Sequence, residues 1–307
     1  MRYIRACSSP KFKYNVLSSY ILMTPRAILL HLRLPFSLFL LPVFWFALSQ
    51  SVTPNLTLSL WVAFILHFLL YPASNAYNSY FDKDEGSIGA LENPPPVDRT
   101  LHHVAWGLDI LALILGTLVG WPFVLYLLIY GLISKAYSHD RIRLKKYPVW
   151  SWLIVSLFQG GFTYVMTFQA INNTPPGQLF TTRTLLAGLL CTLNIMAMYP
   201  ITQIYQHNED ARRGDLTLSR LLGIQGTFLC TFLVFTASLM GFYIYFEGRS
   251  PFYLLVAFLL PAIIFFGLWF LRVRTDAARA DFRSAMRMTI LSCIGLNGFF
   301  LMLLLMK

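Results

Sequence analysis

The chain has 307 residues, of which 57% are hydrophobic and only 12% are charged, and its mean hydropathy is +0.60. Soluble domains usually carry about twice that share of charge, so the composition excludes a soluble globular protein. The long apolar runs predict membrane helices, because membrane barrels are built from short alternating strands. The net charge of +11 lies in the segments between these runs, and we therefore expect no nucleic-acid partner.

The first 26 residues contain Arg2, Arg5, Lys11 and Lys13 but lack the order of basic, apolar and small-residue segments that marks a signal peptide. We predict that residues 1–26 form a basic cytoplasmic tail that lies on anionic lipid. Residues 27–307 then form one transmembrane domain.

Counting about 20 apolar residues per crossing, we predict an all-α polytopic membrane protein with about nine spans. The third and fourth spans are both short and are separated only by a Gly-Trp-Pro turn at residues 120–122. The predicted spans are 27–49, 57–78, 101–119, 121–138, 149–170, 183–205, 221–246, 252–271 and 288–306.

Basic residues are distributed unevenly between the two sides of this topology. Of the 24 Lys and Arg, only Arg183, Arg249 and Lys307 fall on one side, and the other 21 fall on the opposite side. The positive-inside rule makes the basic side cytoplasmic. We therefore expect a multi-pass protein of the inner or plasma membrane, in contact with its lipids, with a cytoplasmic N-terminus. The cytoplasmic loops hold every acidic residue except Asp109 and Glu247.

A first polar cluster follows the second predicted span. Asn78 and Asp82 stand four residues apart, which places them on one helix face, and Asp84 and Glu85 follow directly. Because Mg²⁺ binds oxygen ligands, often one or two carboxylates together with substrate phosphates, we predict that these four residues are metal ligands. The alternative is a solvated helix end whose acids balance a basic membrane surface.

A second polar cluster lies at residues 206–215, where an amide is again followed four residues later by an aspartate, Asp210. Glu209 and Asp210 are predicted to face the first cluster across one cavity and to hold metal ions against a phosphorylated substrate. Arg212 and Arg213 interleave with these acids. The alternative is a hydrated loop with weak local ion pairs.

A third segment, residues 135–148, is rich in basic side chains that include Arg143 and Lys145. An arginine fork and a lysine point charge suit the oxygens of a diphosphate and can neutralise it as it departs. The alternative is an ordinary positive-inside loop. The cytoplasmic loops are therefore expected to carry the chemistry, with the active site open to the cytoplasm.

Four motifs follow one another along the chain. They are Arg33-Leu-Pro35, Asn78-Ser-Tyr-Phe-Asp82 with Asn93-Pro94, Tyr137-Ser138 with Arg143-Leu-Lys145, and the run from Asp210 to Leu218. Taken in this order, they resemble the motifs of the UbiA superfamily of intramembrane prenyltransferases, and the resemblance covers almost the whole chain.

This resemblance implies helices around a central cavity and Mg²⁺-dependent transfer of a polyprenyl group. The donor would be a polyprenyl diphosphate and the acceptor a hydrophobic aromatic or lipid molecule. The implied catalytic residues are Asp82, Asp210 and Lys145. The implied diphosphate-binding residues are Asn78, Arg143, Lys145 and Arg213. The implied metal ligands are Asn78, Asp82, Asp84, Glu85, Glu209 and Asp210.

The sequence also departs from the family pattern, because Ser79, Gly86 and Gln206 stand where that pattern has acids. Asp84 or Glu85 in the first cluster and Glu209 in the second would have to replace them. Two alternatives to transfer therefore remain. One is a UbiA-type terpene cyclase, and the other is a non-catalytic transporter or lipid-binding membrane protein.

Overall fold

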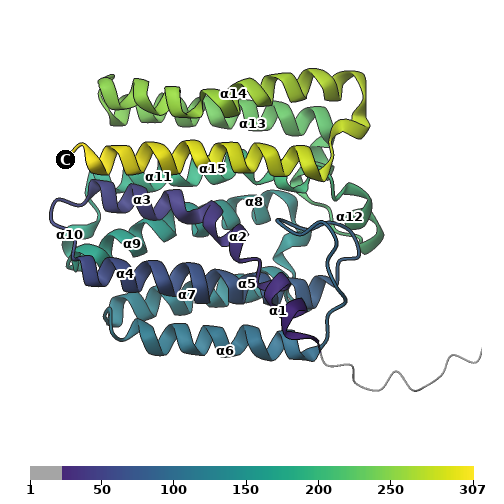
Figure 1. The fold of residues 1–307 in the computed structure, drawn as a ribbon, viewed down its shortest axis with the longest axis horizontal. Coiled ribbons are helices and arrows are strands. Elements are labelled where there is room, and N and C mark those ends of the chain that lie inside the picture. The colour runs from purple at the N-terminus through teal and green to yellow at the C-terminus, as the bar shows by residue number, and fades with distance from the viewer. Residues whose placement is uncertain (1–22) are drawn as a thin grey trace, which may run out of the picture.

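The computed structural model describes residues 23–307, and most of the predicted tail 1–26 lies outside them. Within the described residues every regular element is a helix, apart from one isolated β-bridge between Ile88 and Leu91. The predicted all-α class is therefore confirmed. Figure 1 shows long helices lying side by side between two ends of the molecule.

Seven helical stretches are long and apolar enough to cross a membrane, and each coincides with a predicted span. They are Pro25–Gln50, Leu56–Asp82, Pro148–Asn172, Thr182–Gln203, Leu218–Tyr245, Ser250–Thr275 and Phe282–Leu305. Two more helices, α6 (Arg99–Gly116) and α7 (Trp121–Ser138), match the two short predicted spans but do not belong to these seven.

Several of the stretches are composed of shorter helices joined end to end. The first contains α1 (Pro25–Leu32), α2 (Leu34–Ser37) and α3 (Leu41–Gln50), and the second contains α4 (Leu56–Phe64) and α5 (Tyr71–Asp82). The remaining helices are α8 (Pro148–Ser156), α9 (Thr163–Asn172), α10 (Pro176–Leu179), α11 (Thr182–Met198), α12 (His207–Arg213), α13 (Leu218–Tyr245), α14 (Ser250–Thr275) and α15 (Phe282–Leu305).

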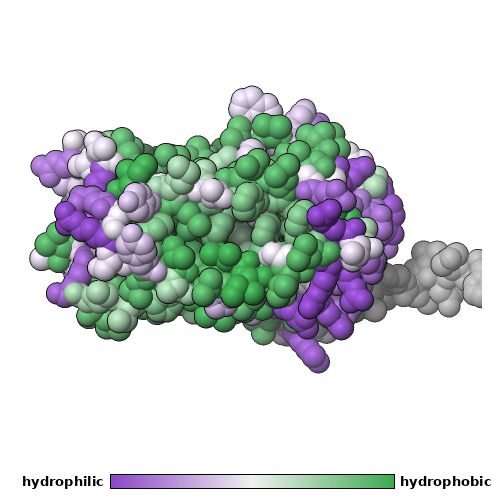
Figure 2. Space-filling view, turned by 90° about the horizontal axis from the view of Figure 1, so that it is seen from above, coloured by the Kyte–Doolittle hydropathy of each residue, from purple (hydrophilic) through white to green (hydrophobic). Residues whose placement is uncertain are grey.

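The surface has the pattern of an integral membrane protein. In Figure 2 hydrophobic residues form a broad belt, and hydrophilic residues gather at its two ends. The short α12 and the start of α1 lie at one end, whereas the C-terminus of α15 lies at the other (Figure 1). Such a belt suits the hydrocarbon layer of a bilayer.

The first stretch breaks at Arg33, which adopts a left-handed backbone conformation with φ 48° and ψ 48°. Pro35 at the start of α2 prevents a continuous helix across this point. The break directs the Arg33 side chain inward, where its Nη2 donates a hydrogen bond to the carbonyl oxygen of Asn75, 3.2 Å away. It thereby joins the first stretch to α5 beside the polar cluster.

Two π-helical turns, Ile65–Leu70 and Leu157–Phe162, interrupt the second and fifth predicted spans. The second turn contains Gly160 and Gly161, which press against α11. A Cβ atom on Gly160 would lie 2.6 Å from the Cα of Thr192, and the Gly161 amide donates to Thr192 Oγ1 at 3.0 Å. Only glycine permits this approach, and the turn brings Gln159 to the central cavity.

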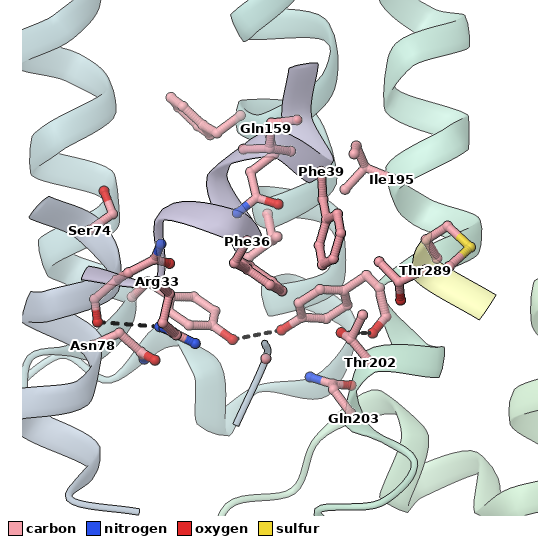
Figure 3. A pocket seen from close by; sticks show the side chains of 18 of the residues that line it. Arg33, Phe36, Phe39, Ser74, Asn78, Gln159, Ile195, Thr202, Gln203 and Thr289 are labelled. Atoms are coloured by element: carbon pink, nitrogen blue, oxygen red, sulfur yellow. Dashed lines mark hydrogen bonds between the residues drawn. The ribbon is translucent and has the colours of Figure 1, made fainter. Parts of the chain in front are cut away.

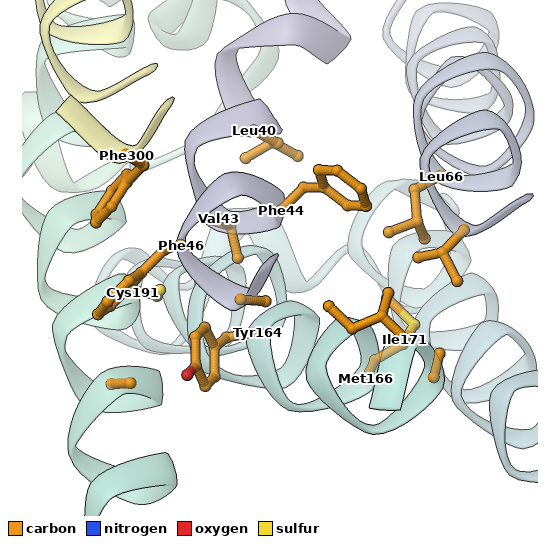
Figure 4. Packing of buried hydrophobic residues seen from close by; sticks show 14 of the residues in the cluster. Leu40, Val43, Phe44, Phe46, Leu66, Tyr164, Met166, Ile171, Cys191 and Phe300 are labelled. Carbon is orange, nitrogen blue, oxygen red and sulfur yellow. The ribbon is translucent and has the colours of Figure 1, made fainter. Parts of the chain in front are cut away.

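The main hydrophobic core joins α3 to α9, α11 and α15 (Figure 4). Phe46 is fully buried and stacks on Phe300 with ring centroids 4.5 Å apart, and the ring of Tyr164 also packs against it, with centroids 5.3 Å apart. This core fixes α3 against α15 and lies beneath the apolar part of the cavity.

A buried ion pair joins α6 to α7, between Asp109 and Lys135. The Lys135 ammonium also lies over the ring of Tyr77 from α5, 4.7 Å from its centroid, and 5.6 Å from that of Trp106. The two short helices therefore pack on α5 through a charge that is compensated inside the protein.

Candidate active site

A cavity of about 300 Å³ lies between the helices (Figure 3). Phe36 and Phe39 from the first stretch project into it. Most of the surface of its lining is apolar, and the lining reaches the core residues Phe46 and Phe300. The charged side chains in the lining are Arg33, Asp82, Asp84, Lys145, Asp210 and Asp215.

The first wall of the charged region is the last turn of α5. Asn78 Nδ2 donates to Asp82 Oδ2 at 2.7 Å and to Ser138 Oγ at 3.1 Å, so the amide fixes the carboxylate against α7. The helix ends at Lys83, whose φ of 49° is left-handed. This turn brings Asp84 to the cavity as well.

The second wall is α12 with the loop after it. Asp210 lies in the first turn of α12 and accepts a hydrogen bond from Thr217 Oγ1 at 3.0 Å. Gly214 ends the helix in a left-handed conformation with φ 72°. The chain then turns back so that Asp215 is almost completely buried in the cavity lining.

The basic segment joins the two walls. Lys145 forms an ion pair with Asp82 of the first wall, and its Nζ lies 3.4 Å from Asp215 Oδ2 of the second. Arg143 binds Asp215 through two hydrogen bonds, Nε to Oδ1 at 2.8 Å and Nη2 to Oδ2 at 2.9 Å. Such a paired geometry is among the strongest side-chain interactions in proteins.

The acids of the site differ in the direction in which their pKa values are shifted. Burial, and then the neighbouring charge of Asp82, raises the pKa of Asp84 to about 6, and burial raises the pKa of Asp210 to about 6. Burial would also raise the pKa of Asp215, but the hydrogen bonds from Arg143 and the charge of Lys145 outweigh it and lower that pKa. The negative charges of Asp84 and Asp210 are thus the less well compensated ones.

Arg213 extends from α12 towards the first wall. Its Nη1 lies 3.3 Å from Asp84 Oδ1 and 3.9 Å from Asp82 Oδ1, and its Nε lies 3.5 Å from Glu209 Oε1. The guanidinium therefore bridges the two acidic clusters that the sequence predicts.

The predicted site residues fall into three positions. Those that line the cavity are Asn78, Asp82, Asp84, Lys145 and Asp210. Arg143, Arg213 and Glu209 lie outside the lining, and each contacts an acid or base of the two walls. Glu85 is exposed and lies outside the lining, so we do not include it in the site proposed below.

The positions without the expected acids are also informative. A Cβ atom on Gly86 would lie 3.1 Å from Glu209 Oε2, so the carboxylate of Glu209 lies where a side chain at position 86 would begin. Gln206 lines the cavity and donates from Nε2 to the Ser87 carbonyl oxygen at 3.1 Å. Ser79 is buried within α5.

Some residues of the site had no predicted role. Asp215 belongs to the second polar cluster, but its partner Arg143 is 72 residues away in the sequence, so no local pattern reveals the pair. The hydroxyls of Tyr137 and Tyr199 lie 2.7 Å apart in the lining, and only Tyr137 belongs to a recognised motif.

The side chains of the two walls suit a magnesium ion chemically, because their carboxylates and amides offer the oxygen atoms that Mg²⁺ prefers as ligands. Within residues 23–307, however, no three His, Cys, Asp or Glu side chains are arranged to hold a metal ion by themselves. Mg²⁺ is often held by one or two carboxylates together with substrate phosphates, and Asp82, Asp84 and Asp210 line the same cavity.

Comparison with known protein families shows to which family the chain belongs. The model of the UbiA prenyltransferase family matches residues 38–292, which include both walls and the basic segment. The chain belongs to the UbiA prenyltransferase family. No curated protein matches the sequence.

Solved structures of UbiA proteins share the fold. A UbiA homologue from Archaeoglobus fulgidus, bound to DMAPP and Mg²⁺, has a TM-score of 0.67 and 14% identity, and the match covers 92% of this chain and 100% of that one. An apo UbiA homologue from Aeropyrum pernix K1 gives 0.66 and 15%, covering 88% and 98%. A structure described as digeranylgeranylglyceryl phosphate synthase gives 0.57 and 14%, covering 91% and 98%.

Proposed function

We propose that the protein is an intramembrane prenyltransferase, which moves a polyprenyl group from a polyprenyl diphosphate to a hydrophobic aromatic or lipid acceptor with the help of Mg²⁺. The observation that carries this proposal is the cavity of a UbiA family member, in which charged side chains from two walls adjoin a long apolar lining. The UbiA homologues from Archaeoglobus fulgidus that share the fold bind DMAPP or GPP together with Mg²⁺.

The charged residues have distinct tasks in this proposal. Asp82 and Asp84 on one wall and Asp210 on the other would hold the metal, with the amide oxygen of Asn78 beside them. When bound, Mg²⁺ would neutralise the negative charge that develops on the leaving diphosphate. Lys145, held between Asp82 and Asp215, adds a fixed positive charge to the same group.

The apolar residues protect the reacting carbon. The lining around Phe36, Phe39 and Phe158 excludes water from the prenyl chain, so that an allylic cation is not captured by solvent. The π faces of aromatic rings also attract a cation. Departure of the diphosphate and transfer to an acceptor are therefore favoured over hydrolysis in this cavity.

We further propose that the charged end of the cavity faces the cytoplasm. The start of α1 and the helix α12 lie at the same end of the molecule (Figure 1). The basic loops that follow α5, α7 and α14 share the side that the positive-inside rule assigns to the cytoplasm.

The decisive experiment measures diphosphate release by the purified protein in detergent, with Mg²⁺, prenyl diphosphates of several lengths and a panel of aromatic and lipid acceptors. We expect release that depends on Mg²⁺ and is lost in Asp82→Ala. The matched control is Glu92→Gln, because Glu92 is an exposed acid that lies outside the cavity lining and pairs with Arg283 at 3.0 Å on the surface.

Each alternative predicts a different result. Release without an acceptor, accompanied by a cyclic product, would favour a terpene cyclase. Transport of a substrate into vesicles with no diphosphate release under any condition would contradict the prenyltransferase proposal.

A further inference from the structure

The charges at the polar end of the cavity nearly balance without any metal ion. Five acids gather there, namely Asp82, Asp84, Glu209, Asp210 and Asp215. The basic side chains that contact them within the loops are Arg143, Lys145, Arg212 and Arg213. A site that was built to gather several divalent cations would leave more of its carboxylates without a fixed cation.

Arg213 is a second cation, besides Lys145, that joins the two walls. It starts from α12, yet it reaches Asp84 at 3.3 Å and Asp82 at 3.9 Å on the first wall, and it also lies 3.5 Å from Glu209 on its own helix. Its side chain is only 17% exposed. One guanidinium therefore lies among three carboxylates, as a divalent cation does when it joins two acidic loops.

The neighbouring Arg212 shows that an arginine of α12 does not necessarily reach the first wall. Arg212 Nη2 binds the same Glu209 carboxylate at 2.8 Å, but its side chain is 66% exposed, and within the described part of the chain it forms no ion pair with the acids of the first wall. Both arginines contact Glu209, but only Arg213 also contacts the acids of the first wall.

The surroundings of Glu209 support the same view. Its carboxylate lies next to the bare backbone of Gly86, where a side chain would meet it at 3.1 Å. The acid thus comes from the second wall, and it is already neutralised by Arg213 and Arg212. Among residues 23–307 no basic side chain forms an ion pair with Asp210, and the hydrogen bond that its side chain accepts comes from the uncharged Thr217.

We propose that Arg213 takes the place of one divalent cation, so that a diphosphate binds at this site with a single metal ion and with the Arg213 guanidinium as the second positive centre. The guanidinium fork suits phosphate oxygens as well as carboxylates. The inference rests on the proposed function. It specifies how many metal ions bind with the diphosphate and which residue takes the place of the second ion.

The test counts bound metal ions instead of turnover. Purified protein is titrated with Mn²⁺ in the presence of inorganic diphosphate, and bound Mn²⁺ is measured by electron paramagnetic resonance and equilibrium dialysis. We expect one Mn²⁺ per wild-type chain. In Arg213→Gln we expect diphosphate affinity at low Mn²⁺ to fall about tenfold or more, because a charged hydrogen-bond donor is lost, and to recover as a second Mn²⁺ binds.

Two further variants separate this effect from damage to the fold. Arg212→Gln should bind one Mn²⁺ with wild-type diphosphate affinity, although it removes an arginine from the same helix and the same Glu209. Arg213→Lys keeps the positive charge and should also bind one Mn²⁺. Each variant is compared with the wild type for elution as a single species and for melting temperature.

The possible failures are distinct. Two Mn²⁺ ions bound to the wild type with diphosphate would overturn the inference and leave the prenyltransferase proposal intact. The inference also fails if Arg213→Gln binds one Mn²⁺ and diphosphate as tightly as Arg212→Gln. A wild-type chain that binds neither Mn²⁺ nor diphosphate would contradict the proposed function itself, and the inference with it.

Discussion

Replacing Asp215 by asparagine removes the charge on which the basic segment depends. The Asp215 side chain is 2% exposed, and it binds Arg143 through two short hydrogen bonds and Lys145 at 3.4 Å. Loss of one partner from a buried ion pair costs about 3–5 kcal/mol, because the other charge stays buried. Since Arg143 is partly accessible to water, with 18% of its side chain exposed, we expect about 3 kcal/mol.

Thermal unfolding in detergent without metal measures this loss. A change of about 3 kcal/mol should lower the melting temperature of Asp215→Asn by about 5 °C or more. Diphosphate release should also fall, because Lys145 loses one of the two carboxylates between which it lies.

Asp140→Asn is the matched control, because Asp140 contacts the same Arg143 at 3.2 Å but is 66% exposed. Exposed pairs contribute about 0–1 kcal/mol, so this variant should melt within about 2 °C of the wild type. The double variant Arg143→Met with Asp215→Asn should recover part of the stability, since no arginine then remains beside an uncharged partner. If Asp215→Asn and Asp140→Asn melt at the same temperature, the argument from burial is wrong.

Two more predictions concern packing and pH. Gly160→Ala should destabilise the protein by about 1–3 kcal/mol, since its Cβ would meet the Thr192 backbone, whereas Gly107→Ala, with open space around it, should leave the melting temperature unchanged or raised. Equal melting temperatures would refute the close approach. The pKa of Asp84 and that of Asp210 are raised from 3.8 to about 6 in the folded protein, so their contribution to stability is complete below pH 4 and is lost as the pH rises through 6. Relative to a double Asn variant at these two positions, the metal-free wild type should therefore lose melting temperature as the pH rises from 5 to 7.5.

The apolar runs in the sequence were sufficient to predict where the long helices lie. Hydrophobic length is a property of the local sequence, and the predicted second span 57–78 ends within α5. The interruptions of these helices depend on distant residues. His67, in the first π-helical turn, is bound to the carbonyl oxygen of Ser37 at 3.0 Å, and Gly160 fits against α11. A single stretch of sequence contains no sign of either partner.

The polar site shows the same division. Asn78 and Asp82 were predicted together because they stand one turn apart on α5, and the structure joins them by a hydrogen bond of 2.7 Å. Arg143, in contrast, was predicted to bind diphosphate, and the structure shows its guanidinium bound to Asp215. Spacing along a helix predicts which residues are neighbours on that helix. It does not predict which of several distant acids a basic side chain will bind.

The buried pair of Asp109 and Lys135 has a consequence for how the chain enters the membrane. An aspartate at the centre of a lone spanning helix costs about 2.5–3.5 kcal/mol on insertion. Asp109 lies near the middle of α6, and its partner Lys135 lies in the last turn of α7. The short turn at Gly120 lets both helices enter as one hairpin, with the charges already neutralised by each other. The Lys135 ammonium lies over the ring of Tyr77 from α5. Because α5 is synthesised before α6 and α7, it provides the surface against which this hairpin packs.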